Sequence, residues 1–117
     1  GDVELGYVDS LSIAPDPFLF TADYEQYAYF AKMRDRIQHY LFGGKGKQLT
    51  DEEIVAFENS NPNGYLTYYY LGEYFKSQKD WERAKHYFEI GLTKEIAKVS
   101  ERRHMEKGIE ICNEKTK

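Results

Sequence analysis

The residues that could do chemistry are few and lie far apart in the sequence. His39, His86 and His104 fall in three separate segments, so no two of them have the i, i+4 spacing that presents two imidazoles to one metal ion. Cys112 is the single cysteine, and a thiol is a nucleophile only beside an activating base. We expect it to be a small core residue on the apolar side of the last helix. We therefore assign no catalytic residue, no metal ligand and no cofactor.

Two further stretches carry residue types that occur at ligand sites. Asp51, Glu52 and Glu53 could be paired acids, but Thr50 stands three residues before Glu53, which is a capping box at a helix start. The run GGKGKQ, from Gly43, places lysines beside glycines. A phosphate-binding loop needs a strand before it and Ser or Thr after its lysine, and we find neither. We predict a flexible connector there and no enzyme activity.

Composition limits the function classes further. The 117 residues are 41% hydrophobic and 31% charged, which is typical of one folded domain. A net charge of −4 does not make the basic field that nucleic-acid binding needs, and no apolar run is long enough to span a membrane. Asp2 has no initiator Met before it, so we expect a piece of a longer protein. The cellular compartment stays open.

The elements that must position these residues are five helices, and we predict an all-α fold of antiparallel hairpins. Residues 1–20 contain two prolines and are expected to be an extended linker or tail. The remaining 21–117 form the helical domain. The first helix should begin near Thr21 or Asp23 and run to Phe42. The other predicted helices are a short one after Thr50, one at 65–77, one at 81–96 capped by Asp80, and one at 101–114 capped by Ser100.

The third and fourth predicted helices should form a tight hairpin around the turn at 78–80. Gly72 should face Ala84, because two small residues let helix backbones approach closely. This pair resembles the tetratricopeptide repeat, whose pattern alternates aromatic and small residues over a helical hairpin. The matching positions are Tyr68, Leu71, Gly72, Phe75, Trp81, Ala84 and Phe88.

The resemblance covers residues 65–98 and is weaker elsewhere. Gly91 stands where the family usually has Ala, and Ile96 stands where it usually has Pro. The segment 21–62 is similar to a degenerate preceding hairpin, and the segment 100–114 to a polar capping helix. This similarity implies a non-catalytic module that makes protein–protein or interdomain contacts.

In that family the first helix of a hairpin lines the binding groove. Tyr69 and Glu73 stand where one subgroup uses Lys and Asn to hold a peptide carboxylate, so that clamp is absent. The chain has eleven tyrosines, which indicate either helix packing or a recognition surface. The candidate partner-binding residues, for a protein or peptide partner, are Tyr65, Leu66, Tyr69, Glu73 and Lys76. Either this surface is open, or a neighbouring helix or another domain covers it.

A second, looser resemblance extends over the whole chain. The runs PDPFLFT, LTDEEI and NPNGYLTYYYLGEYF, followed by Arg103-His104 and the late Cys112, are similar to the C-terminal extension of bacterial autoproteolytic acyltransferases of the N-terminal-nucleophile class. This resemblance implies a structural accessory domain whose catalytic domain lies outside this chain. It transfers no catalytic residue.

Overall fold

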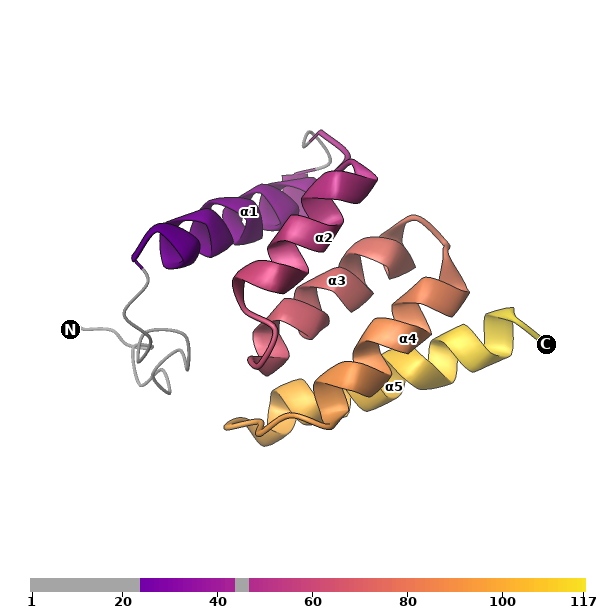
Figure 1. Cartoon of the computed structure of the whole chain (residues 1–117). Coiled ribbons are helices and arrows are strands. Elements are labelled where there is room, and N and C mark those ends of the chain that lie inside the picture. Colours follow the sequence, from indigo (N-terminus) through magenta and orange to yellow (C-terminus); the bar gives the residue numbers. More distant parts are fainter. Residues whose placement is uncertain (1–23, 44–46) are drawn as a thin grey trace.

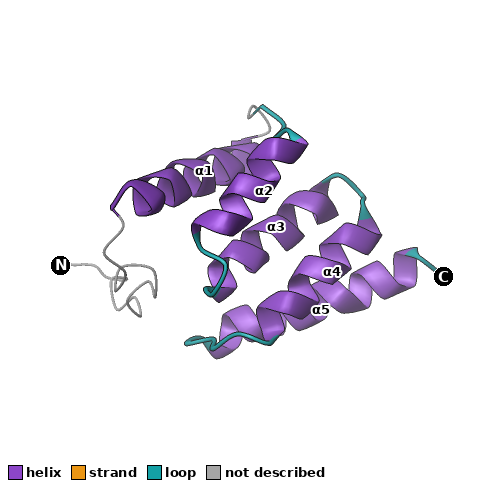
Figure 2. Ribbon diagram, viewed as in Figure 1, coloured by secondary structure: helices purple, strands orange, loops and turns teal. Residues whose placement is uncertain are grey.

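A computed structural model describes residues 24–43 and 47–117, and these ranges contain five helices and no strand (Figures 1 and 2). The predicted all-α architecture is confirmed. The predicted linker at 1–20 and the caps Thr21 and Asp23 lie outside the described residues. The helices are α1 (Tyr24–Gly43), α2 (Asp51–Ser60), α3 (Tyr65–Ser77), α4 (Trp81–Leu92) and α5 (Val99–Lys115).

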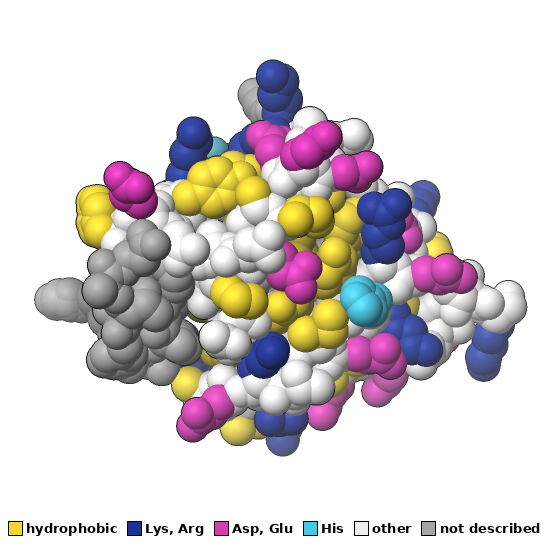
Figure 3. Space-filling model, viewed as in Figure 1, with side chains coloured by type: hydrophobic (Ala, Val, Ile, Leu, Met, Phe, Trp, Pro, Cys, Tyr) yellow, Lys and Arg dark blue, Asp and Glu magenta, His cyan; other side chains and the backbone are white. Residues whose placement is uncertain are grey.

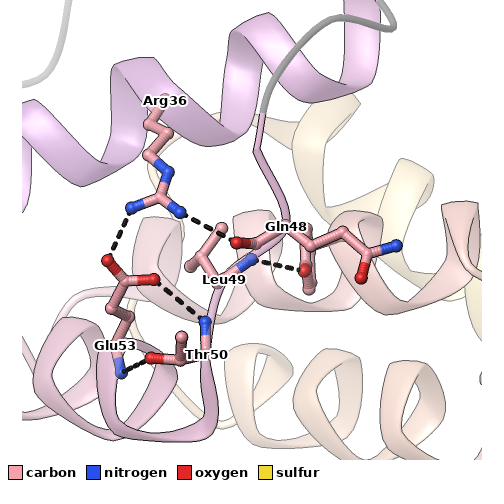
Figure 4. A network of polar contacts seen from close by, with 6 residues as sticks. Arg36, Gln48, Leu49, Thr50 and Glu53 are labelled. Carbon is pink, nitrogen blue, oxygen red and sulfur yellow. Dashed lines mark hydrogen bonds and ion pairs between the residues drawn. The ribbon is translucent and has the colours of Figure 1, made fainter.

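The start of α2 is fixed by the predicted capping box. Glu53 N donates to Thr50 Oγ1 at 3.1 Å, and Thr50 N donates to Glu53 Oε1 at 2.9 Å. Arg36 of α1 joins this network, because its Nη1 lies 2.6 Å from Glu53 Oε2 and its Nη2 donates to the Gln48 carbonyl at 2.8 Å (Figure 4). The cap therefore also attaches α2 to α1.

Helix α3 is the centre of the fold, since it contacts each of the other four helices. Its side chains are buried on several sides, including those of Tyr68, Leu71 and Phe75. Tyr74 is also buried, and its hydroxyl accepts a hydrogen bond from Leu49 N at 2.8 Å. A helix surrounded in this way needs apolar or amphipathic residues around most of its circumference, which explains its many tyrosines.

The turn at 78–80 joins α3 to α4 as predicted. Lys79 N donates to Lys76 O at 3.0 Å and Asp80 N donates to Phe75 O at 2.9 Å, which is the Schellman pattern of a helix end. Lys79 adopts a φ of 64°, in the left-handed region that usually holds glycine. The carboxylate of Asp80 then caps α4 by accepting from Arg83 N at 3.3 Å.

The hairpin is tight, but its close contact differs from the predicted one. The atoms nearest to a Cβ built on Gly72 belong to the ring of Phe88, at 2.5 Å, rather than to Ala84. A Cβ on Gly108 of α5 would lie 2.7 Å from the same ring. Phe88 therefore occupies space that two glycines on two other helices leave free. An aromatic ring fills the close approach of the helices, and Ala84 is buried nearby without being the closest group.

Two predicted helix boundaries were wrong. Helix α4 ends at Leu92 rather than at Ile96, because Thr93 directs both its backbone N–H, at 3.0 Å, and its hydroxyl, at 2.6 Å, to the carbonyl of Ile90. Such i to i−3 bonds close the last turn. Helix α5 begins at Val99, with Lys98 at the cap position, because the Lys98 carbonyl accepts the first helical hydrogen bonds. The predicted cap Ser100 lies inside the helix.

Candidate functional site

The residues predicted to bind a partner all lie on α3, and the structure brings side chains of α1 and α5 to them. Tyr70, next to Tyr69, accepts a hydrogen bond from Gln38 of α1, and Tyr69 packs against His104 of α5. These contacts make one continuous surface across three helices. We call it the α1–α3–α5 face, and define it by Gln38, Tyr69, Tyr70, Glu73, Lys76 and His104.

Tyr65 and Leu66 lie at the more buried end of the predicted set. Tyr65 is 7% exposed, and its hydroxyl donates to a carboxylate oxygen of Glu101 on α5. Leu66 is half-buried and packs against the core. Both residues hold α5 and the core together, so they leave little surface for a partner.

Glu73 is the charged centre of the face. Its Oε2 lies 2.8 Å from His104 Nε2 and 3.5 Å from Lys76 Nζ, and its side chain is 17% exposed. The carboxylate thus connects α3 to α5 while one cation of its own helix sits beside it. An ion pair this well shielded fixes side-chain positions more firmly than a fully exposed pair does.

Tyr69 and Tyr70 form the aromatic part of the face. Their rings meet edge to face, with centroids 5.4 Å apart. The Tyr69 ring also lies 5.4 Å from the His104 ring, and Gln38 Nε2 donates to the Tyr70 hydroxyl at 2.9 Å. Both tyrosines are half-buried, so each keeps some surface in contact with solvent.

Burial also sets the protonation of these two phenols. Burial, reinforced by the negative charge of Glu73, raises the pKa of Tyr69 to about 12. Burial is likewise the main reason that the pKa of Tyr70 is raised. Both hydroxyls therefore stay protonated at neutral pH, where they serve as neutral hydrogen-bonding groups.

Sequence analysis found one part of this face and missed another. Tyr69, Glu73 and Lys76 follow helical spacing on a single helix, so the pattern alone places them together. Gln38 and His104 come from other helices, and nothing in their local sequence marks them. The run Tyr68-Tyr69-Tyr70 was the available signal for Tyr70.

The remaining chemical candidates are accounted for by packing. Cys112 is fully buried, and burial raises the pKa of its thiol. In residues 24–43 and 47–117, no three His, Cys, Asp or Glu side chains are grouped so that they could hold a metal ion. An open depression of about 420 Å³ lies between α1 and α2 and carries no nucleophile paired with a base. It is lined by Glu25, Gln26, Tyr29, Ala56, Asn59 and Ser60.

The described helices were also compared with membrane spans. Over the described part of the chain, no helix is both long and apolar enough to cross a bilayer.

Comparisons of the chain with protein-family models, with curated proteins and with solved structures found no match. The resemblances to the tetratricopeptide repeat and to the acyltransferase extension therefore stay predictions from the residues quoted above.

Proposed function

We propose that this chain is a non-catalytic helical module that binds another protein, or another domain of a longer polypeptide, through the α1–α3–α5 face. The observation that carries the proposal is the edge-to-face pair of Tyr69 and Tyr70, half-buried between α1 and α5. Tyrosines of this kind are enriched at the energetic centres of protein interfaces.

The support comes from how firmly these rings are held. Gln38 fixes the Tyr70 hydroxyl, and His104 and Tyr70 pack on two sides of the Tyr69 ring. A ring that is already immobilised loses little conformational entropy when a partner binds, so more of the contact energy appears as affinity. The tetratricopeptide resemblance agrees with this choice, because α3 is the hairpin helix that lines the groove in that family.

The face also restricts the partner's chemistry. Glu73 stands at its centre, so a free carboxylate such as a peptide C-terminus meets like charge there. The phenol hydroxyls and the rings favour a peptide segment with backbone polar groups and apolar side chains. We therefore propose an internal peptide segment as the ligand.

The alternative proposal is a structural accessory domain of a bacterial acyltransferase or hydrolase, and it uses the same face. The runs LTDEEI and NPNGYLTYYYLGEYF favour it, and they occupy the start of α2 and the turn into α3. In that case the occupant is the catalytic domain of the same polypeptide. Co-expression with the preceding part of the gene separates the two, because a stable complex forms only if that domain is the occupant.

A peptide-library selection on the folded chain tests the proposal. Selected peptides should shift the backbone resonances of Gln38, Tyr69, Tyr70 and His104 in nitrogen–proton correlation spectra. Glu89 on the exposed side of α4 serves as the control position and should not shift. Peptides that shift α4 residues and leave Tyr69 unchanged would place binding elsewhere and reject the face.

A further inference from the structure

A row of three aromatic rings lies between α3 and α4, away from the α1–α3–α5 face. The Tyr87 ring of α4 stacks on Tyr68 at 6.3 Å and on Phe75 at 5.6 Å, and these two rings come from α3. Two cations of the chain lie over the row. The Arg83 guanidinium is 5.2 Å from the centre of the Phe75 ring, and Lys94 Nζ is 5.5 Å from that of Tyr68. The row therefore already attracts cations.

Glu58 of α2 reaches the same row. Its Oε2 accepts a hydrogen bond from the Tyr68 hydroxyl at 3.0 Å, and the side chain is partly buried. Glu58 makes no ion pair with a Lys, Arg or His among residues 24–43 and 47–117. The negative charge of Glu58 also acts on Tyr87, since burial first and Glu58 second raise the pKa of that phenol. Glu58 is thus a carboxylate held against two rings without a counter-charge.

The surface beside Glu58 is apolar. Figure 3 shows hydrophobic side chains gathered over the middle of the molecule, between α2 and α4, with an acidic side chain among them. Val55 lies three residues before Glu58 on α2, so the two share a helix face, and Val55 is 57% exposed. An apolar residue, a carboxylate and a ring edge therefore adjoin one another.

We propose that Glu58, Tyr87 and Val55 form a binding site for an arginine side chain of a partner protein. The carboxylate supplies the counter-charge, the ring of Tyr87 supplies a surface for the guanidinium, and Val55 contacts the aliphatic stem. Within the chain, the packing of Arg83 on Phe75 already shows that a guanidinium fits this aromatic row. A planar guanidinium can pair with a carboxylate and stack on a ring at once, which a lysine ammonium cannot do in the same geometry.

This site goes beyond the proposed function, because it lies on a different surface and involves different residues. A variant of Glu58 leaves Gln38, Tyr69, Tyr70 and His104 untouched, so the two surfaces can be tested separately. Failure of either one leaves the other standing.

The test titrates the labelled chain with N-acetyl-arginine amide and, separately, with N-acetyl-citrulline amide, which has nearly the same shape and no charge. We expect the arginine derivative to shift Val55, Glu58 and Tyr87 with a Kd on the order of millimolar. The citrulline derivative should bind about tenfold more weakly, because it lacks the charge that Glu58 pairs with. This comparison uses the unmodified chain.

Glu58→Gln is the second arm, since an amide oxygen still accepts from the Tyr68 hydroxyl. It should weaken arginine binding about tenfold, whereas Glu89→Gln on the exposed face of α4 should not change it. Equal shifts with the citrulline derivative, unchanged binding by Glu58→Gln, or shifts located away from Val55 and Tyr87 would each overturn the proposal.

Discussion

The ring of Phe88 fills the space that a side chain on Gly108 would occupy, with ring carbon 2.7 Å from the position of a Cβ there. Gly72 stands in the same relationship to this ring from α3. One residue of α4 therefore determines how closely both neighbouring helices approach. Because α5 supplies His104 to the α1–α3–α5 face, the packing of Phe88 also sets the position of part of the candidate site.

Gly108→Ala should destabilise the fold. Alanine gains helix propensity, but its methyl group would overlap the Phe88 ring, and overpacking of a closed core costs about 1–3 kcal/mol. Urea unfolding followed by circular dichroism measures the difference. Gly43→Ala at the end of α1 is the matched control, because a Cβ there has no atom within 4 Å. If both variants were equally stable, the Phe88 contact would have no energetic role.

Lys79→Gly should stabilise the chain. Lys79 has a φ of 64°, which strains a residue with a Cβ, and glycine removes that strain while keeping both Schellman hydrogen bonds. We expect a gain of about 0.5–1 kcal/mol, offset in part by the greater freedom of glycine in the unfolded chain. Thermal unfolding monitors it. A lower melting temperature would show that the lysine side chain stabilises the turn in another way.

The ion pair between Arg36 and Glu53 should make stability depend on pH. The hydrogen bond from Arg36 is the main reason that the pKa of Glu53 lies below its ordinary value of 4.5. A carboxyl with a lowered folded pKa stabilises the fold above its unfolded pKa, and this contribution is lost as pH falls through the folded pKa. Glu53→Gln should therefore cost roughly 0.5–1 kcal/mol at neutral pH and progressively less below about pH 4.5.

Glutamine at position 53 can still complete the capping box, so this variant isolates the charge on the pair with Arg36. Glu52→Gln is the control, because Glu52 lies in the same first turn and is exposed. Unfolding curves at several pH values would reject the assignment if both variants had the same effect at every pH.

Local signals predicted the parts of the fold that depend on a few neighbouring residues. Thr50 with Glu53, and Asp80 after the turn at 78–80, are caps whose partners lie three residues away. The helical spacing of Tyr69, Glu73 and Lys76 likewise placed three site residues on one side of α3. Such interactions are written in the sequence because helix geometry fixes their spacing.

The remaining features join residues far apart in the chain. Gln38 meets Tyr70 across 32 positions, and Glu73 meets His104 across 31 positions. Their pairing depends on how the helices pack, which spacing within one helix does not reveal. The same reason explains the wrong partner for Gly72, since the choice between Ala84 and Phe88 is a matter of rotation about the axis of α4.

The most direct test of the central claim is the affinity of a selected peptide for three forms of the chain, measured by calorimetry. Tyr69→Ala should weaken binding at least about tenfold, because it removes a rigid ring from the middle of the α1–α3–α5 face. Its cost in folding stability should stay near about 1 kcal/mol, since the ring is half-buried. Glu89→Ala, on the exposed side of α4, should bind as the unmodified chain does. Equal affinity of all three forms would contradict the proposed binding face.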